Sequence, residues 1–428
     1  MMTTIKEALA DLKIEVYSIQ ERLSESLELY FIRKQLDMRR QTRVLTCQVT
    51  VYRDFEENDV RYRGSAMAVI GDGMTGEEIR EQLASAYSSA AFAKNRWYPL
   101  PENTVSGGVA DRDEELSAHW DSQAMELAEA AFAVDTDERV FLNSLEIFAR
   151  KTRVHLFNSC GVDVAYQTCG VDGEFVVQCT SPQDVETYED FHYDRLDPSA
   201  IREKIARTLQ RTRDRAEASV SPKAGKYRLI LSDKYVPTVM SYFVDRSHAA
   251  YVYPGYSNYR VGDDVQMAGS EEPVTGDRIH MTLTATVPYS GEGLEMKDRV
   301  LLEDGVLKAI HGSSRFCHYL GVEPTGEYRK VTVKPGTVSM ASMKTEPYLH
   351  VVNFSDFQMD SFTGSFAGEI RLAYLYDGEQ VTVVTGGSVN GNIVEAQKQM
   401  ALSEETQDTT QFCGPMAVAI RKVTVAGA

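Results

Sequence analysis

Histidine and cysteine are the first residues to test for chemistry, because they hold most catalytic zinc ions and supply many nucleophile and base pairs. The chain has eight histidines and six cysteines in 428 residues, and no histidine is followed by glutamate. His311 and His318 are seven residues apart, with Cys317 between them. On one helix they would share a face about 10 Å apart along the axis, which is long for chelation. We interpret both as ordinary helix histidines.

Sequence motifs for other chemistry are also missing. The chain has no G-x-S-x-G nucleophile elbow, no Walker A motif and no strand-flanked G-x-G-x-x-G. Gly312-Ser313 and Gly364-Ser365 read as glycine–serine turns without an identifiable base. Paired acids such as Asp263-Asp264 are typical of solvated loops in an acidic protein. We therefore predict no catalytic residue and no metal ligand in this chain.

Glycine turns separate short β-rich runs between residues 351 and 393. Asp377-Gly378 lies between two such runs, which is the pattern of a tight hairpin. The other glycines let backbone approach backbone, or let it approach a bound peptide. Both interpretations remain open, so we predict peptide contacts at a set of residues that could equally serve tight strand packing: Gly364, Ser365, Gly368, Gly386, Gly387 and Gly391.

Four motifs follow one another along this stretch: Thr363-Gly364-Ser365-Phe366, Glu369-Ile370-Arg371, Tyr376-Asp377-Gly378-Glu379 and Gly391-Asn392. Their order resembles the C-terminal signature of the TldD/PmbA (TldE) family, whose members are labelled modulators of DNA gyrase. Residues 300–307, the Asn158-Ser159-Cys160-Gly161 turn and the terminal run 423–427 resemble further parts of the family pattern.

In the TldD side of the family, the resemblance implies a zinc peptidase. A helix at the start of the second domain there carries HExxxH, and a late cysteine is associated with the same site. Here the corresponding residues 238–248 hold a single histidine, His248, at their end, although Cys413 resembles the late cysteine. The resemblance therefore implies a TldE/PmbA-like, non-catalytic subunit of a metallopeptidase complex that degrades or processes unfolded peptides. Zinc is expected in a TldD-like partner and no cofactor in this chain.

Two alternatives remain beside that interpretation. The first is an active stand-alone metallopeptidase with an unconventional site, drawing on Cys413, His248, His311 or His318. The second is a non-proteolytic binding protein that forms a homodimer. A TldD-like sequence carrying HExxxH and encoded beside this one would favour the subunit interpretation over both.

The composition excludes some classes of partner. A formal net charge of −18 argues against nucleic-acid binding, which requires clustered lysine and arginine, and it disfavours acidic peptides. No apolar run approaches the roughly 20 residues that span a bilayer, and the amino terminus reads as an amphipathic helix rather than a signal peptide. We therefore expect a cytoplasmic protein without membrane contact.

The periodicity predicts an α+β chain of two domains. Residues 1–221 should form antiparallel sheets with flanking helices, and residues 222–428 a mostly β domain. A first helix is predicted from a Thr4–Glu7 capping box to Leu23, and Asp172-Gly173 is predicted as a hairpin turn. Asp197-Pro198 predicts a helix to about Ala218 whose outer face carries arginines. The segment 95–113 reads as a long loop, either a flap or a mobile connection.

Overall fold

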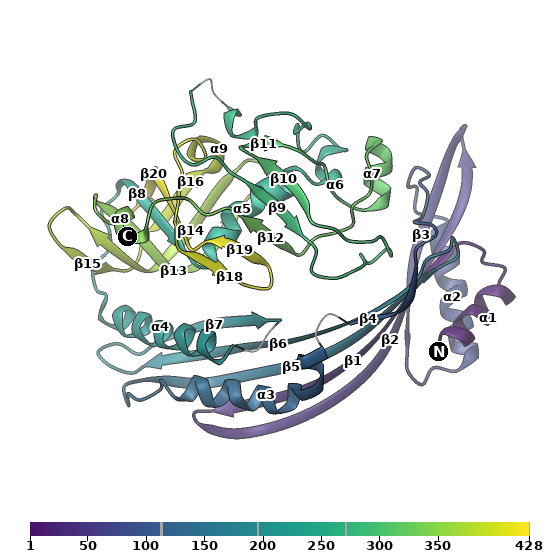
Figure 1. Ribbon diagram of the computed structural model, residues 1–428, viewed down its shortest axis with the longest axis horizontal. Helices are drawn as coiled ribbons and strands as arrows, with labels where there is room; N and C mark the ends of the chain where they lie inside the picture. Colours follow the sequence, from purple (N-terminus) through teal and green to yellow (C-terminus); the bar gives the residue numbers. More distant parts are fainter. Residues whose placement is uncertain (112–113, 195–196, 270–271, 428) are drawn as a thin grey trace.

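The computed structural model describes residues 1–111, 114–194, 197–269 and 272–427, except for the side chains of residue 107 and residues 109–121. A long curved sheet built from the first half of the chain sweeps beside a compact β-rich unit built from the second half (Figure 1). The fold class is α+β, as the periodicity predicted. Among the described residues, no helix has the length and apolarity needed to cross a membrane.

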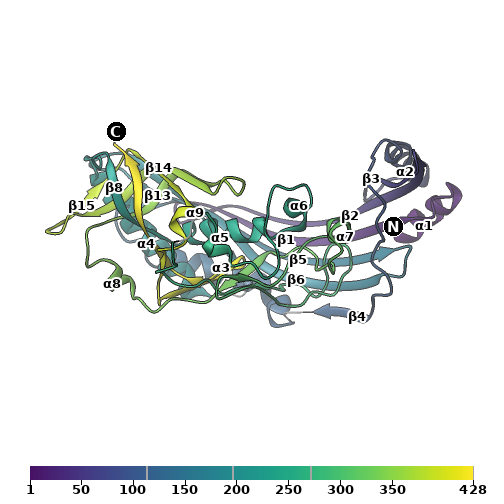
Figure 2. The ribbon, with the colours of Figure 1, turned by 90° about the horizontal axis from the view of Figure 1, so that it is seen from above.

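The curved sheet has seven strands in the order β3-β2-β1-β5-β6-β4, with β7 also paired to β6. All its pairs are antiparallel except β4 with β6. Its long strands bend with the twist of the sheet, so the sheet passes beneath the second unit (Figure 2). The strands are β1 (Tyr17–Ile32), β2 (Gln35–Glu57), β3 (Val60–Gly71), β4 (Val105–Asp111), β5 (Val140–Asn158), β6 (Asp163–Cys179) and β7 (Val185–Tyr193).

Two pairs of helices cover the two ends of this sheet. At one end, α1 (Met2–Asp11) and α2 (Gly76–Ala90) pack on β1, β2 and β3 in one apolar cluster. At the other end, α3 (Glu114–Phe132) and α4 (Pro198–Glu217) share a cluster with β1, β5 and β6. The predicted N-cap of α4 is confirmed, because the Asp197 carboxylate accepts the amide hydrogens of Ser199 and Ala200.

Two predictions for the first half are wrong. The first helix ends at Asp11 and has no side-chain cap, so neither the Thr4–Glu7 capping box nor the helix to Leu23 forms, and β1 starts at Tyr17. Asp172-Gly173 is not a turn but lies inside β6, paired to β5 and β7. Gly173 is required there by packing, because a Cβ atom would lie 2.2 Å from the Phe191 ring and 2.4 Å from the Glu146 carbonyl oxygen.

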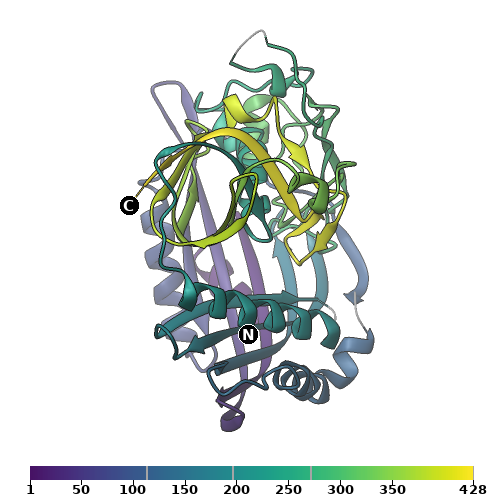
Figure 3. The same cartoon turned by 90° about the vertical axis from the view of Figure 1, so that its left-hand side faces the viewer.

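Five strands of the second unit close into a ring. Each of them pairs with the next in the cycle β13-β8-β20-β16-β14, and β14 pairs back to β13 (Figure 3). Strands β15 and β17 add to the outside of β14 and β20. The strands are β8 (Gly225–Ser232), β13 (Tyr348–Met359), β14 (Ser365–Tyr376), β15 (Val381–Val384), β16 (Ser388–Asn392), β17 (Ala401–Leu402) and β20 (Ala417–Ala426).

A second sheet packs with this ring around a shared core. Its order is β11-β10-β9-β12-β19-β18, and its buried side chains join those of the ring and of α5 (Tyr235–Arg246) in one cluster. Its strands are β9 (Met281–Thr284), β10 (Arg299–Glu303), β11 (Val306–Leu307), β12 (Lys330–Val333), β18 (Thr406–Asp408) and β19 (Phe412–Pro415). The remaining helices are short: α6 (Ala249–Val252), α7 (Ser314–Leu320), α8 (Met340–Met343) and α9 (Ile393–Ala396).

The two units touch at both ends of the second one. At one end α4 lies against β14 and β15, and the Tyr374 hydroxyl donates to Asp214 at 2.5 Å. At the other end α7 rests on the start of the predicted loop 95–113, where Arg315 donates to Asn95 at 3.0 Å and the Trp97 and His318 rings meet edge to face. That loop also contains β4, and residues 112–113 lie outside the described residues.

Candidate functional site

Helix α5 occupies the place where the family resemblance implies a zinc-binding helix. It starts directly after β8 and turns six side chains into the core: Tyr235, Val236, Val239, Met240, Tyr242 and Phe243. None of its twelve residues is a histidine or a glutamate. The face that would carry metal ligands is therefore an apolar packing surface, and α5 itself does not fit a zinc ion.

His248 follows α5 and lies against His311, with ring centroids 4.9 Å apart. Both nitrogens of His248 are engaged: Nδ1 accepts the amide hydrogen of Ala250 at 3.1 Å, and Nε2 lies 2.8 Å from the Glu327 carboxylate. Since Nδ1 accepts, Nε2 carries the proton and donates to Glu327. No lone pair of this ring is then left for a metal ion.

His311 is only 2% exposed, and its Nε2 lies 3.0 Å from the carbonyl oxygen of Val244. A carbonyl can only accept, so Nε2 carries the proton, while Nδ1 has no hydrogen-bond partner. Burial lowers the pKa of His311 to about 4, and the ring is therefore neutral at physiological pH. His311 and His248 form a structural pair, and the described residues contain no group of three histidine, cysteine or acidic side chains arranged to hold a metal.

The remaining candidates for an unconventional site lie in different elements. The prediction that His311 and His318 share a helix is wrong, because α7 begins at Ser314 and includes only His318. The Cys317 thiol donates to the Gly312 carbonyl, and burial raises its pKa to about 11. Cys413 is half-buried in β19, where burial and the neighbouring Asp408 raise its pKa. Both thiols are thus held in the protonated form, which is the poorer nucleophile and ligand.

The six residues predicted to contact a peptide lie around β14 and β16. Gly368 is paired on one side to Phe357 of β13 and on the other to Val389 of β16. Because both backbone edges are occupied within the ring, a peptide cannot add a strand at this position. A Cβ atom on Gly368 would lie 2.7 Å from the Asp356 carbonyl oxygen, so its lack of a side chain serves internal packing.

The other members of this set are also engaged within the ring. A Cβ atom on Gly391 would lie 2.2 Å from the Phe366 ring, and one on Gly387 would lie 2.5 Å from the Ala426 carbonyl oxygen. Gly364 and Gly386 have positive φ values of 76° and 83°, as turns require. Ser365 is exposed and starts β14 opposite Asn392. Peptide binding by this set stays a prediction, and the contacts favour the packing interpretation.

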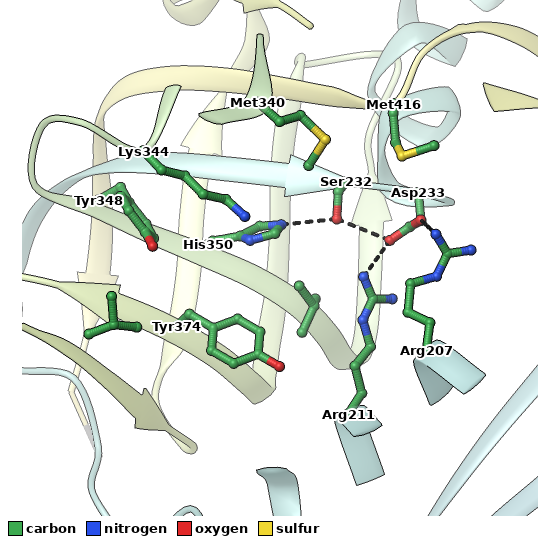
Figure 4. A pocket seen from close by; sticks show the side chains of 12 residues that line it. Arg207, Arg211, Ser232, Asp233, Met340, Lys344, Tyr348, His350, Tyr374 and Met416 are labelled. Carbon is green, nitrogen blue, oxygen red and sulfur yellow. Dashed lines mark hydrogen bonds and ion pairs between the residues drawn. The ribbon is translucent and has the colours of Figure 1, made fainter. Parts of the chain in front are cut away.

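A pocket of about 400 Å³ lies where α4 meets the ring (Figure 4). This size falls within the range of about 300–1,000 Å³ that is typical of small-molecule sites. We name it the α4 pocket. Its lining comes from α4, the end of β8, α8 and its following turn, β13, β14, β15 and the link between β19 and β20: Arg207, Arg211, Ser232, Asp233, Met340, Lys344, Tyr348, His350, Val352, Tyr374, Val381 and Met416.

A chain of polar contacts crosses one wall of the α4 pocket. Arg211 donates to Asp233 at 2.7 Å, and Arg207 lies 3.5 Å from the other oxygen of the same carboxylate. The Ser232 hydroxyl donates to Asp233 at 3.1 Å, and His350 Nε2 lies 3.0 Å from that hydroxyl. Burial opposes the charge on Asp233, but the two guanidinium groups outweigh it and lower its pKa to about 2.

Ser232 and His350 have the residue types of a nucleophile and its base, but the hydrogen bond between them runs in the wrong direction for proton transfer from serine to histidine. Since the Ser232 proton points to Asp233, its oxygen accepts the Nε2 proton of His350 and cannot pass a proton to that nitrogen. Burial, together with the charges of Lys344 and Arg211, lowers the pKa of His350 to about 3. A ring that weakly basic is a poor general base at neutral pH. The arrangement is therefore suited to binding rather than to acyl transfer.

Sequence reasoning did not find the α4 pocket. The arginine face of α4 was visible as a pattern, and its acidic partners are now identified within the chain: Asp233 for Arg207 and Arg211, and Asp137 for Arg213. Lys344 and His350 gave no signal, because neither belongs to a motif. Only the pairing of β13 with β8 brings His350 beside Ser232, a residue 118 positions earlier.

The comparisons with known proteins agree with the motif order. Residues 224–427 match the model for the PmbA/TldA metallopeptidase C-terminal domain. A protein named "Metalloprotease" from Methanothermobacter thermautotrophicus is 23% identical over 362 residues, which cover 79% of this chain and 69% of that protein.

Solved structures are similar over the whole length. The crystal structure of TldE from Thermococcus kodakarensis has a TM-score of 0.78 at 15% identity and covers 100% of both chains. A candidate modulator of a DNA gyrase from Thermotoga maritima has a TM-score of 0.75 at 16% identity, again with 100% of both chains covered. One from Bacteroides thetaiotaomicron has a TM-score of 0.77 at 15% identity and covers 100% of this chain and 99% of its own. Residues 224–427 are therefore a domain of the PmbA/TldA metallopeptidase C-terminal type, and the chain as a whole has the fold of these solved structures.

Proposed function

We propose that this chain is a non-catalytic, TldE/PmbA-like subunit of a cytoplasmic metallopeptidase complex that degrades or processes unfolded peptides. A TldD-like partner would hold the zinc ion and supply the chemistry. The observation that carries the proposal is helix α5, which packs apolar side chains where the family's catalytic members need an HExxxH helix. The name of the Methanothermobacter relative supports the link to peptidases.

The residues around α5 also support a non-catalytic role for this chain, with the zinc ion held by the partner. One ring nitrogen of the neighbouring His248 caps α6, and the other is hydrogen-bonded to Glu327. His311 is buried, and its pKa is lowered to about 4. A zinc ion bound here would have to break these contacts, and each buried polar group left without a partner costs about 1–3 kcal/mol. This chain would instead contribute a stable frame, the curved sheet with its ring, on which a partner could assemble.

Metal content of the purified chain is the first test. The untagged protein is expressed with added zinc, and its metal is measured by inorganic mass spectrometry after gel filtration. We expect less than about a tenth of an equivalent, since structural and catalytic zinc sites need three or four protein ligands. A full equivalent that disappears in His248→Gln or Cys413→Ala, but not in the control Cys169→Ala, would instead identify a stand-alone metallopeptidase.

Assembly with a catalytic partner is the second test. The chain is co-expressed with the HExxxH-containing TldD-like protein of the same genome, and complex mass and hydrolysis of an unfolded peptide are measured. We expect a mixed complex that is active, while this chain alone is inactive and the complex loses activity when the partner's motif glutamate is replaced. A chain that forms only homodimers, and leaves the partner's activity unchanged, would contradict the subunit proposal and favour the non-proteolytic binding protein.

A further inference from the structure

The α4 pocket concentrates positive charge in a strongly acidic protein. Three cations line it, Arg207, Arg211 and Lys344, against one anion, Asp233. The pocket wall therefore carries more positive than negative charge, although the chain as a whole has a formal net charge of −18. A local excess of cations in a concave, partly desolvated site attracts anions more strongly than the same charges would on an open surface.

Lys344 is the cation that is left for a ligand. Arg211 and Arg207 are both directed to Asp233, whereas the Lys344 ammonium has no hydrogen-bond or ion-pair partner in the described part of the chain. The side chain is half-buried and points into the pocket beside the ring of His350 (Figure 4). Burial and the nearby Arg211 lower the pKa of Lys344 and outweigh the opposing effect of the Glu405 carboxylate, which is too far away to form an ion pair with the ammonium.

The rest of the lining is suited to an apolar group. Tyr348, Val352, Tyr374, Val381, Met340 and Met416 surround the charged corner. The Tyr374 hydroxyl is already bonded to Asp214, so the ring presents mainly its carbon face to the pocket. A bare inorganic anion would leave this wall uncovered, whereas an acid with an aromatic or branched side chain would fill it.

We propose that the α4 pocket binds an organic monocarboxylate, with its carboxylate on Lys344 and its apolar group against Tyr348 and Tyr374. A single ammonium matches a single carboxylate, and Lys344 is the cation of the lining that has no direct ion pair among the described residues, whereas Arg207 and Arg211 are each held on Asp233 through one nitrogen. This chemistry is shared by free organic acids and by the C-terminal residue of a peptide. The proposal is independent of the subunit function proposed above.

Isothermal titration calorimetry tests the proposal on the full-length protein with two matched pairs of probes. The first pair is 3-phenylpropionate and its neutral amide, and the second is Ala-Ala-Phe and its C-terminal amide. We expect each acid to bind at least about tenfold more tightly than its amide, because only the acid can pair with Lys344. Tighter binding of the tripeptide identifies a peptide C-terminus as the ligand, and tighter binding of 3-phenylpropionate identifies a free acid.

Variants assign the binding to the pocket. Lys344→Gln should weaken binding of the acids about tenfold and leave the amides unchanged, while Lys334→Gln, an exposed control, should change neither. Val381 is 56% exposed at the rim, so Val381→Glu should fold normally and also weaken binding of the acids through repulsion. Equal binding of acids and amides, wild-type affinity in Lys344→Gln, or no binding of any probe up to about 10 mM would overturn the proposal.

Discussion

Asp233 gives the most direct test of how the two units are held together at the α4 pocket. Asp233 directly follows β8 in the second unit. Its carboxylate forms ion pairs with Arg207 and Arg211 of α4 in the first unit, at 3.5 Å and 2.7 Å. The side chain is 24% exposed, so solvent screens these contacts only in part. Asp233→Asn keeps the shape of the side chain and removes its charge, which leaves two guanidinium groups without their shared partner.

The pKa of Asp233 sets the size and the sign of the effect. It falls from 3.8 to about 2 because the two guanidinium groups outweigh the opposing effect of burial. A change of this size corresponds to about 2 kcal/mol of folding free energy. Because the folded pKa lies below the unfolded one, this contribution is complete above about pH 4 and is lost as the pH falls toward about 2.

Urea unfolding followed by circular dichroism measures this contribution at neutral pH, at about pH 5 and at about pH 3. We expect Asp233→Asn to be less stable than the wild type by about 2 kcal/mol at the two higher pH values, with a smaller difference at the lowest. Asp72→Asn, which changes an exposed carboxylate in the turn after β3, is the control. A difference no larger than that of the control, or one that persists unchanged at low pH, would refute the reasoning.

Two further predictions concern the curved sheet. Gly173→Ala should destabilise the protein by about 1–3 kcal/mol because its Cβ would overlap the Phe191 ring and a backbone oxygen, whereas Gly71→Ala, whose Cβ would meet nothing within 4 Å, should be neutral or slightly stabilising. Thermal unfolding of the two variants decides this, and equal melting temperatures would contradict the packing argument. His192 should titrate with a pKa near the value of about 9 that its hydrogen bonds to Asp172 and Asp190 produce. Its stabilising contribution is complete below about pH 6.5 and is lost as the pH rises through about 9, and an NMR titration giving a pKa below 7 would contradict it.

The ring of strands limits how this chain could bind an extended peptide. Extended peptides often bind by adding a strand to an open sheet edge. Strands β13, β8, β20, β16 and β14 pair in a closed cycle, and closure removes such edges. A peptide bound by this chain would therefore have to use side-chain contacts, as in the α4 pocket, or an outer strand.

Several elements could be predicted because local physical rules decide them. The Asp197 cap of α4 formed as its pattern indicates. The Asp377-Gly378 turn also formed, with Gly378 at a φ of 110°. In each case the stabilising contact joins residues a few positions apart, so the sequence contains both partners.

The two wrong predictions come from local patterns that fit more than one structure. Ile19 and Leu23 are four residues apart, which fits a helix face and also fits one face of a strand. The long-range pairing of β1 with β2 and β5 selects the strand, and no local signal records it. Asp172-Gly173 is ambiguous in a different way, because a glycine after aspartate is typical of a turn but is also required where neighbouring residues leave no room for a Cβ atom.

By itself the sequence determined the fold class, the family resemblance and the missing HExxxH motif, because residue types, their order and their spacing are local properties of the chain. Only the tertiary structure decided which distant side chains meet. In the folded chain His311 is buried against His248, Asp233 pairs with two arginines, and Lys344 lies beside His350 without a direct ion pair in the described residues. These pairings depend on strand register and on how α4 docks on the ring, and burial then sets the charges and pKa values that determine what each site can bind.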